Sequence, residues 1–386
     1  MKPRILIYST AYYPLVGGAE IAIKEITDRL GDQYDFDLIT AKINKGLPKV
    51  EKIGQVTVYR LGWGTFLDKP WLAFQGGKFG LRLHQKNSYK MIWSMMASYG
   101  GFAASAFKAK QPTVPYLLTL QEGDELSEVE SKVRLVKKQF KNIFLRANYV
   151  QVISNYLADW AKRMGVVVPI KVVPNGVDLN NFELQMTSEE LGTIDKRLNK
   201  KEGDRVIITT SRLVKKNGLS DLIQSLVFMS DEVKLWILGV GPEEKSLKKL
   251  VVGLGLTSRV VWLGFIDNTQ LLPYLKEADV FVRPSLSEGL GNSFLEAMAV
   301  GLPTVGTAVG GIVDFLKPNE TGWLVKVRDP KSIAETVNFI LDPVNKEEVE
   351  RIARQGKEHV QARYDWKIVD REMEKIFEKL VHSPSQ

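Results

Sequence analysis

The residues of greatest chemical interest form one segment in which two carboxylates flank a glycine-rich turn. Glu288 and Glu296 stand eight residues apart, and the turn between them contains Gly289, Gly291, Asn292 and Ser293. Backbone amides of such a turn, together with the start of a helix, bind phosphate. Carboxylates repel phosphate but accept hydrogen bonds from hydroxyl groups. The segment therefore predicts a ligand that carries a phosphate beside a sugar or ribose.

A basic turn forms a second candidate site. The stretch 211–218 follows an apolar run at 205–210 and contains Arg212, Lys215 and Lys216. An arginine side chain can donate hydrogen bonds to two phosphate oxygens at once, so this turn suits a diphosphate. A solvated basic turn without a ligand is the alternative. A tight turn with Gly239 and Gly241 follows the next apolar run.

A glycine pair follows the first apolar run of the chain. Gly17 and Gly18 lead into a predicted helix, where backbone amides can approach an anion. The pair is neither Gly-x-Gly-x-x-Gly nor a phosphate loop with Gly-Lys-Ser/Thr. An ordinary strand-to-helix turn explains it equally well.

The elements that must position these residues alternate between strands and helices along the whole chain. Runs such as Val206–Ile208 are apolar at successive positions, which indicates parallel strands buried on both faces. We predict strands at 4–9, 36–40, 55–61, 90–95, 115–120, 149–153, 170–173, 205–210, 233–238, 259–263, 279–282 and 303–306. We predict helices at 18–31, 127–145, 155–164, 217–229, 242–253, 292–300 and 366–381.

This alternation predicts an α/β protein with two doubly wound domains. We place the first domain at 1–182, the second at 183–364 and a final helical segment at 365–386. The polar stretch 183–203 is the predicted linker between the two domains.

The composition excludes several classes of protein. The chain has 386 residues, of which 44% are hydrophobic and 25% charged, as is usual for globular domains. It contains no cysteine, which excludes disulfides, cysteine-bound metals and a thiol nucleophile. No apolar run reaches the roughly 18 residues of a membrane span, and the apolar N-terminal run is too short for a signal peptide. We expect a cytoplasmic protein.

The net charge of +8 predicts an anionic partner. Nucleic acid, an anionic membrane and a phosphorylated small molecule all fit that description. No nucleic-acid-binding motif accompanies the charge, so we expect no nucleic acid.

The motifs occur in an order that resembles one family. The Glu288–Glu296 spacing and its continuation through 297–305 resemble the Glu-x7-Glu segment of retaining GT-B glycosyltransferases of the GT4 family. The family pattern also includes Gly17–Gly18, the stretch 174–178 with Phe182, the turn 239–242 and Tyr364–Trp366.

The resemblance implies a GT-B fold, in which two Rossmann-like domains face each other across a cleft. The C-terminal domain would bind a UDP- or GDP-sugar donor, and the N-terminal domain would bind a glycan, lipid-linked or small-molecule acceptor. The last helix would return to the N-terminal domain. The resemblance implies no metal and no cofactor, and cell-envelope polysaccharide synthesis as the setting. Asp35–Asp37 matches Asp-x-Asp, but it lies at a strand start, so we treat it as a coincidence.

The resemblance also assigns roles to residues of this chain. Arg212 would contact the donor diphosphate, Glu288 the donor sugar and Glu296 the ribose hydroxyls. The nucleobase would be held through the backbone of the loop at Phe265 and Ile266. The remaining predicted donor-binding residues supply backbone amides or small turns near the phosphates: Gly17, Gly18, Gly239, Gly241, Gly289, Gly291, Asn292 and Ser293.

Two positions depart from the family pattern. The diphosphate-binding Lys is expected five residues after Arg212, where this chain has Asn217, with Lys216 just before it. Lys216 is the favoured substitute, and loss of one cation is the alternative.

The second departure is Gln121, which occupies the place of a His that many members carry. A Gln cannot act as a base. Glu122 or Asp124 would be the base, or the leaving phosphate would take the proton. A solvated loop or helix cap is the other explanation for both acids.

Two further stretches concern the acceptor and the membrane. The stretch 132–146, predicted to be helical, has an apolar stripe and six cations, which suits either contact with an anionic bilayer or an ordinary surface helix. The stretch 71–96 is rich in aromatic and Met residues, which suits core packing or a greasy acceptor site. Membrane contact would place the protein at the inner face of the plasma membrane.

We weigh two other functions against a glycosyltransferase. A nucleotide-dependent oxidoreductase or epimerase would need Gly-x-Gly-x-x-Gly after the first strand, and that motif is missing. A non-catalytic bilobed binding protein is compatible with the charge, but it leaves the residues that follow the strands unexplained.

Overall fold

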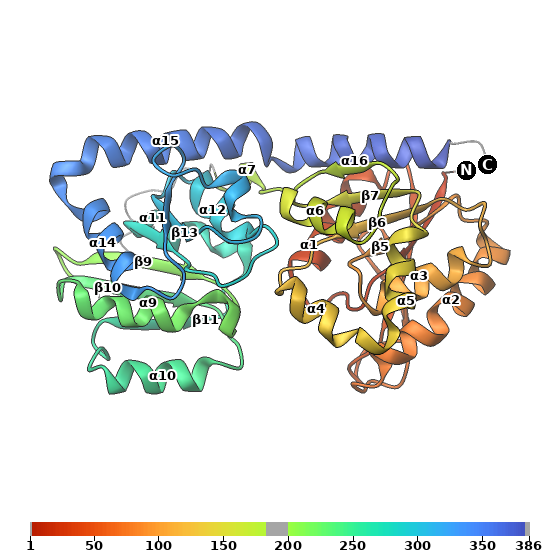
Figure 1. The fold of residues 1–386 in the computed structure, drawn as a ribbon, viewed down its shortest axis with the longest axis horizontal. Helices are drawn as coiled ribbons and strands as arrows, with labels where there is room; N and C mark the ends of the chain where they lie inside the picture. Colours follow the sequence, from red (N-terminus) through yellow and green to blue (C-terminus); the bar gives the residue numbers. More distant parts are fainter. Residues whose placement is uncertain (1, 183–199, 383–386) are drawn as a thin grey trace. The chain divides into compact units, whose positions relative to one another are not determined.

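The computed structural model describes residues 2–182 and 200–382 and divides the chain into two units (Figure 1). Unit 1 comprises Met1–Gly176 and Trp366–Gln386, and unit 2 comprises Val177–Asp365. The chain thus enters unit 2 before the predicted boundary at 182 and 183. The physical reason is that Val177 forms a parallel bridge with Asp365 inside unit 2. Most of the predicted linker, 183–199, lies outside the described residues.

The sheet of unit 1 has eight strands in the order β3-β4-β2-β1-β5-β6-β7-β8. All pairs are parallel except β3 with β4, which form an antiparallel edge. The strands are β1 Arg4–Tyr8, β2 Asp35–Ala41, β3 Val50–Ile53, β4 Val56–Leu61, β5 Met91–Met95, β6 Tyr116–Leu120, β7 Tyr149–Val152 and β8 Ile170–Val172.

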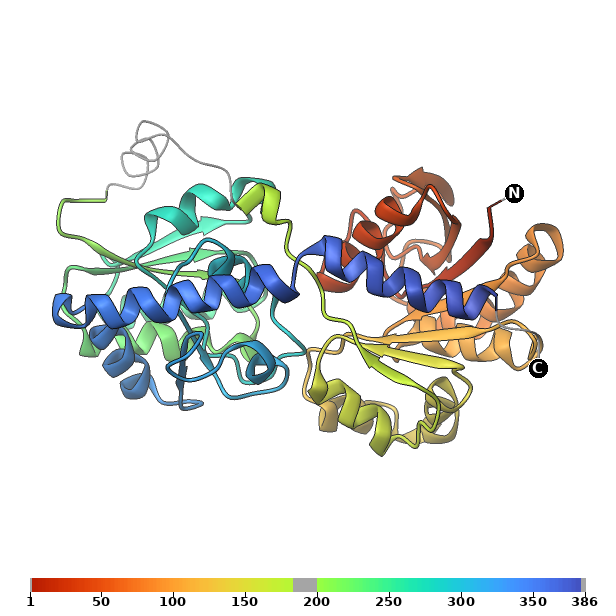
Figure 2. The same cartoon turned by 90° about the horizontal axis from the view of Figure 1, so that it is seen from above.

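Helices cover both faces of this sheet (Figures 1 and 2). The first of these helices, α1, begins at the second glycine of the pair, Gly18, and α16 is the last helix of the chain. The helices of unit 1 are α1 Gly18–Leu30, α2 Asp68–Asn87, α3 Tyr99–Lys108, α4 Leu126–Lys132, a 3-10 turn Arg134–Val136, α5 Lys137–Leu145, α6 Asn155–Arg163 and α16 Trp366–Val381.

The helix α16 packs its apolar face onto the core of unit 1. Its side chain Phe377 is fully buried, and its ring contacts the rings of Tyr34, Phe36 and Trp93. At the surface, Lys171 pairs with Glu372. The last helix therefore completes unit 1, from which it is separated in sequence by all of unit 2.

The sheet of unit 2 has six parallel strands in the order β11-β10-β9-β12-β13-β14. This is the strand order of a Rossmann fold. The strands are β9 Arg205–Thr210, β10 Val233–Leu238, β11 Val260–Gly264, β12 Val280–Val282, β13 Thr304–Thr307 and β14 Trp323–Val325.

Helices again lie on both faces of the sheet (Figure 1). They are α7 Leu179–Phe182, α9 Leu219–Ser225, α10 Glu244–Gly253, α11 Leu272–Glu277, α12 Asn292–Ala299, α13 Ile312–Phe315, α14 Pro330–Leu341 and α15 Lys346–Arg363. Short 3-10 turns span Lys215–Asn217, Leu226–Phe228, Asn268–Gln270 and Pro343–Asn345. None of the described helices is long and apolar enough to cross a membrane.

The predicted fold class is confirmed: each unit is an α/β layer structure built on a mainly parallel sheet. The sequence patterns did not reveal the short edge strands β3 and β14. The predicted helix at 127–145 is wrong, because Val133 leaves the helical conformation at φ −105° and ψ 13°. A 3-10 turn follows, and α5 then buries Phe140, Ile143 and Phe144.

Substitution of Phe377 tests the attachment of α16 to unit 1. We expect Phe377→Ala to destabilise unit 1 by about 3–5 kcal/mol, because it leaves a cavity between three aromatic rings. Urea unfolding followed by tryptophan fluorescence measures the effect, since Trp93 lies at the cavity. Phe339→Ala, on the half-exposed surface of unit 2, is the control and should cost about 1 kcal/mol or less. Equal effects would contradict the packing role.

Candidate functional site

The topology of unit 2 brings two of the predicted motifs together. Strand β9 lies between β10 and β12, and the chain order runs outward from it in both directions. Doubly wound sheets bind ligands at such a switch point, at the carboxyl ends of the strands. Here the loops after β9 and β12 carry Arg212 and Glu288, and the backbone N–H of Leu286 donates to the carbonyl of Lys216 at 2.6 Å.

Two glycines allow these loops to approach each other closely. Gly218 has φ +68°, and a Cβ there would lie 1.9 Å from the carbonyl oxygen of Pro284. Gly310 has φ +53°, and a Cβ there would lie 1.7 Å from the carbonyl oxygen of Glu288. Both positions exclude a side chain. The loops after β9, β12 and β13 therefore pack against each other through backbone atoms.

A buried arginine organises the segment with the two acids. The guanidinium of Arg283 donates to Ser285 Oγ at 3.2 Å, to Ser293 Oγ at 2.5 Å and to Glu288 Oε2. It also stacks on the ring of Phe294, 4.5 Å from the ring centre. Arg283 is only 5% exposed, so these partners replace the water it has lost.

The two acids differ in how they are held. Glu288 pairs with Arg283, and its other oxygen accepts the N–H of Gly289 at 3.1 Å. Glu296 is buried and accepts from Asn268 Nδ2 at 2.9 Å. Burial raises the pKa of Glu296 to about 7, against the lowering effects of Arg283 and Asn268. Glu296 therefore titrates near neutral pH.

The N-terminus of α12 is open to an anion. Its N-cap is Gly291, with φ +99° and no side-chain hydrogen bond to the helix. The hydroxyl of Ser293 accepts from Arg283, which leaves its own proton to donate to a ligand. The amides of Asn292 and Ser293 lie in the first turn of α12, where the helix dipole favours negative charge.

The basic turn presents Arg212 but not Asn217. Arg212 is exposed, whereas Asn217 is buried and donates from Nδ2 to the carbonyl of Arg212 at 2.7 Å. This hydrogen bond closes the turn, so the amide of Asn217 faces its own loop rather than a ligand. The half-buried Lys216 stays the predicted second cation, with loss of one cation as the alternative.

The loops after β10 and β11 lie beside the same edge. Gly239 donates its backbone N–H to the carbonyl of Gly264 at 2.6 Å, and Gly241 lies against the backbone of Leu213. Phe265 exposes its ring, and Ile266 is half-buried. The predicted donor-binding loops of unit 2 thus line the carboxyl edge of one sheet.

In unit 1, the glycine pair lies at the start of α1. Gly17 and Gly18 are exposed, and α1 has no side-chain cap. The carboxylate of Glu20 lies at this helix start, 3.0 Å from where a Cβ of Gly17 would stand. Burial raises the pKa of Glu20, and the backbone N–H groups of Glu20 and Gly17 lower it. An incoming phosphate would therefore have to share these amides with Glu20.

The predicted candidate bases occupy different environments. Gln121 and Asn175 exchange two amide hydrogen bonds, at 3.0 and 3.2 Å. Glu122 is not a solvated loop residue: it is buried, and its Oε1 accepts the N–H of Ala97 at 2.5 Å. Burial raises its pKa to about 7, against the lowering effect of the Ala97 N–H. Asp124 is exposed.

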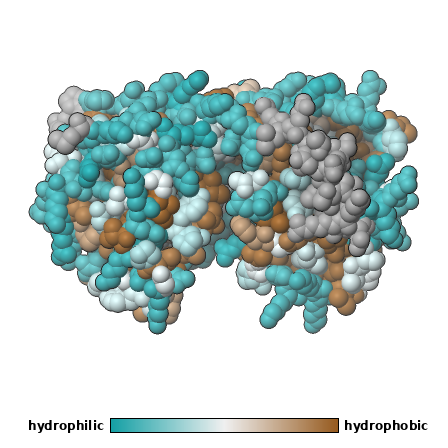
Figure 3. Space-filling model, turned by 180° about the vertical axis from the view of Figure 1, so that it is seen from behind, coloured by the Kyte–Doolittle hydropathy of each residue, from teal (hydrophilic) through white to brown (hydrophobic). Residues whose placement is uncertain are grey.

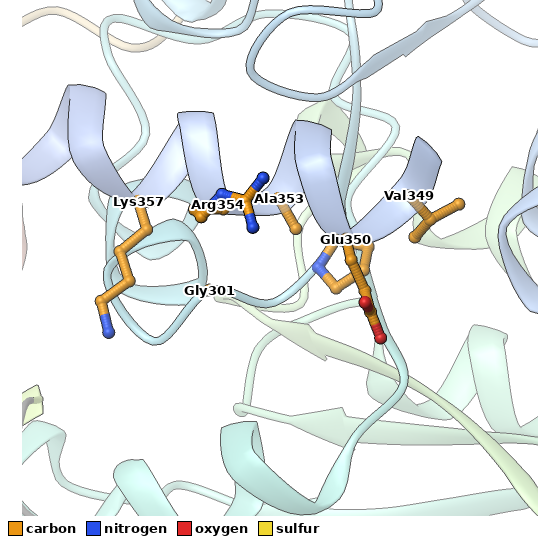
Figure 4. A pocket seen from close by; sticks show the side chains of 7 residues that line it. Gly301, Val349, Glu350, Ala353, Arg354 and Lys357 are labelled. Carbon is orange, nitrogen blue, oxygen red and sulfur yellow. The ribbon is translucent and has the colours of Figure 1, made fainter. Parts of the chain in front are cut away.

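Two pockets of unit 2 lie away from these loops. One is lined by Gly301, Pro303 and the α15 residues Val349, Glu350, Ala353, Arg354 and Lys357 (Figure 4). This pocket lies at the amino end of β13. The second pocket lies at the amino ends of β10 and β11. Neither contains a predicted site residue. Across residues 2–182 and 200–382, no group of three or more His, Asp or Glu side chains is arranged to hold a metal ion.

Sequence reasoning missed three residues of the site. Arg283 directly follows a buried strand, and a cation at that place was a visible signal. Asn268 lies 28 residues from Glu296, and nothing in the sequence pairs them. Asn175 was noted only as part of the stretch 174–178, without its partner Gln121.

Two family descriptions match the chain. "Glycosyltransferase Family 4" matches residues 16–181, and "Glycosyl transferases group 1" matches residues 192–359. An uncharacterized glycosyltransferase of Methanocaldococcus jannaschii is 30% identical over 97% of this chain and 97% of its own length. A GDP-mannose-dependent phosphatidylinositol monomannoside mannosyltransferase of Mycobacterium tuberculosis is 24% identical over 94% and 95%.

Solved structures share the fold of the whole chain. Sucrose-phosphate synthase of Thermosynechococcus elongatus superposes with a TM-score of 0.83 at 22% identity, covering 98% of this chain and 99% of its own. Anabaena HepE in complex with UDP-glucose gives a TM-score of 0.79 at 17% identity, covering 97% and 99%.

The titration of Glu296 predicts a pH-dependent affinity for nucleotide. The folded state holds the proton of Glu296 up to about pH 7, and only the ionised carboxylate accepts hydrogen bonds with both oxygens. We expect the affinity for UDP or GDP to rise as pH increases through 7. Calorimetric titration on both sides of pH 7 measures it. In Glu296→Gln this dependence should vanish, and an unchanged slope would remove the assignment.

A double-mutant cycle tests the buried ion pair. We expect Arg283→Met to destabilise unit 2 by about 3 kcal/mol, because it leaves the half-buried Glu288 without its cation and Ser285 and Ser293 without their donor. Glu288→Gln should cost less, since Arg283 keeps both serine partners. The double variant should cost less than the two single losses added together. Additive losses in urea unfolding would show that the pair does not couple.

Proposed function

We propose that this chain, which belongs to the glycosyl transferases group 1 family and is a glycosyltransferase, transfers a sugar from a UDP- or GDP-sugar with retention of the anomeric configuration. The acceptor is a hydroxyl group of a glycan, a lipid-linked sugar or a small molecule. Two relatives support the choice of donor by name: one is GDP-mannose-dependent, and the other was solved with UDP-glucose.

The observation that carries this proposal is the Arg283 cluster at the carboxyl edge of unit 2. It fixes Glu288, half-buried, beside the open N-terminus of α12. Glu296 lies about one turn into the same helix and accepts a hydrogen bond from Asn268. A ligand with a diphosphate between two hydroxyl-rich groups satisfies the amides, the exposed Arg212 and both acids at once.

The chemistry then follows from charge. The bond between the anomeric carbon and the diphosphate oxygen breaks, the sugar becomes oxocarbenium-like, and the electron pair stays on the leaving diphosphate. Arg212, Lys216 and the α12 amides stabilise that anion with fixed positive charge and dipoles. The acceptor oxygen attacks the anomeric carbon from the side of the leaving group, and its proton passes to the leaving phosphate.

We propose that this reaction needs no metal ion, since side-chain cations and helix amides can balance the diphosphate charge. We assign acceptor binding to unit 1, where Gln121 and Asp124 follow β6 and can hydrogen-bond a sugar hydroxyl. Glu122 is the alternative base, because its raised pKa suits proton uptake near pH 7. Its burial against Ala97 argues for a positioning role in the same loop.

We also propose peripheral contact with an anionic membrane through 132–146, at the inner face of the plasma membrane. In α5, Phe140, Ile143 and Phe144 pack into the core while Lys137, Lys138 and Lys141 are exposed. Leu135 in the preceding turn is 100% exposed. The two explanations of this stretch are therefore compatible. The phosphatidylinositol acceptor in the mycobacterial relative's name supports a membrane setting, and a teichuronic acid synthesis relative of Bacillus subtilis supports cell-envelope synthesis.

A nucleotide screen tests the proposed donor. We expect UDP or GDP to raise the melting temperature, and the matching sugar nucleotide to be hydrolysed slowly or transferred. Arg212→Ala should lower the rate on the order of 10²-fold or more, because the leaving anion loses a cation. Lys215→Ala, a neighbouring exposed cation without an assigned role, is the matched control.

Three outcomes would contradict parts of the proposal. Stabilisation by NAD but by no nucleoside diphosphate would favour an oxidoreductase or epimerase. A product of inverted anomeric configuration, read by NMR, would exclude retention. Loss of activity with EDTA, restored by a divalent cation, would exclude a metal-independent reaction.

A further inference from the structure

The N-terminal half of α2 and the loop before it expose an unusual number of large apolar side chains. On the face drawn in Figure 3, hydrophobic residues reach the surface in small patches between hydrophilic ones. The stretch 63–74 instead exposes a continuous set, which we call the aromatic surface. It consists of Trp63, Phe66, Leu67, Trp71 and Phe74. Phe66 is 79% exposed, Phe74 67% and Trp63 61%.

This exposure follows from how α2 packs. The helix turns Leu72, Gly76 and Gly80 inward, and a Cβ on Gly76 would lie 2.7 Å from the Cβ of Ala103 on α3. The small residues of α2 thus face its neighbour. Leu67, Trp71, Phe74 and Lys78 follow at spacings of four, three and four residues, so they share the opposite, outer face.

The loop before α2 is rigid, so its aromatic residues are held outward. Asp68 is fully buried, and its carboxylate accepts backbone N–H groups from Ile43, Trp63, Gly64 and Thr65. Although burial raises it, these hydrogen bonds leave the pKa of Asp68 below its usual value. The ring of Trp63 contacts that of Trp71 in a tilted arrangement, with ring centres 4.9 Å apart and an angle of 48° between the ring planes. The loop and the helix form one surface.

The chemistry around the aromatic surface selects its partner. Lys78 lies 5.5 Å from the ring centre of Phe74, Lys69 follows Asp68 on α2, and the backbone of Lys45 lies against Gly64. Within 62–87 the only acid is Asp68, whose oxygens are already occupied, against four cations. Phe and Leu side chains make no hydrogen bonds, so they do not fix the orientation of sugar hydroxyls. Exposed aromatic rings can insert at the headgroup level of a bilayer, and the surrounding lysines are attracted to anionic headgroups.

We propose that the aromatic surface inserts into the headgroup region of an anionic lipid bilayer. This contact is distinct from the basic stretch 132–146: it is driven by apolar insertion, whereas that stretch would bind by charge alone. The inference extends the proposed membrane setting of the enzyme, and it does not depend on which sugar is transferred.

Tryptophan fluorescence gives a direct readout. Of the eight tryptophans, only Trp63 and Trp71 are exposed. Vesicles of phosphatidylcholine and phosphatidylglycerol with brominated acyl chains should therefore quench the emission of the full chain. Vesicles of the same composition without bromine should not. Absence of quenching would overturn the inference, while nucleotide stabilisation of the same sample would still report on the proposed donor.

Paired variants test which surface binds. We expect F66S/F74S to weaken vesicle co-sedimentation by about tenfold or more, because two rings that would insert into the lipid are lost. F228S/F339S, which alters two exposed rings of unit 2, is the matched control and should bind like the unaltered protein. K137E/K138E should weaken binding only at low salt.

The remaining outcomes each contradict the inference. Unchanged binding of F66S/F74S would assign the membrane contact elsewhere. If those substitutions instead convert a dimer to a monomer in size-exclusion chromatography, a second copy of the chain covers the surface. If an oligosaccharide shifts the emission of Trp63 and Trp71 and vesicles do not, the surface is a glycan platform. Nucleotide stabilisation equal to that of the unaltered protein shows that each variant is folded.

Discussion

The candidate site depends on one buried cation. Arg283 lies at the end of a fully buried strand, where water cannot solvate its charge, and it has recruited two serine hydroxyls, an aromatic face and the carboxylate of Glu288. Such a charge is costly without partners. The loop from 283 to 293 therefore has little freedom to adopt another conformation. The same contacts orient Glu288, prepare the hydroxyl of Ser293 as a donor and lower the pKa of Glu296 from the value that burial alone would give.

Backbone contacts extend this constraint to the neighbouring loops. The turn after β13 packs on the carbonyl of Glu288, and the turn after β9 packs on Pro284, in both cases through a glycine. Asn217 closes the β9 turn on itself, which leaves Arg212 exposed at its tip. The loop backbones that carry these positive groups are thus arranged before any ligand arrives. Preorganisation of this kind lets charge stabilisation lower a barrier, because no reorientation is needed during the reaction.

The sequence was sufficient for the central strands of both sheets but not for the short edge strands β3 and β14. Buried parallel strands contain distinctive apolar runs, and their carboxyl ends meet at one edge of the sheet. It was not sufficient for the partners of individual side chains. Asn268 meets Glu296, and Gln121 meets Asn175, through folding of distant segments. Glu122 looked like a loop acid, but the loop after β5 covers it. The aromatic residues of 71–96 differ in burial. Trp93 lies on β5 and is buried in the core, whereas Phe74 lies on the outer face of α2 and is exposed.

The net positive charge of the chain depends on the ionisation of two buried acids. The formal value of +8 counts every carboxylate as ionised. Glu122 and Glu296, however, have pKa values raised to about 7 by burial, so both are partly protonated at neutral pH and the protein is more positive than the formula states. The two acids then diverge. Glu296 lies near Arg283, so an added cationic or hydroxyl-rich ligand can complete its ionisation. Glu122 has no such cation beside it: burial and the charge of Asp124 raise its pKa, backbone N–H groups including that of Ala97 lower it, and its Oε2 has no hydrogen-bond partner in the described chain. The two acids thus have similar pKa values but different surroundings: Glu296 lies near a buried cation and an amide, whereas Glu122 lies against the backbone of Ala97.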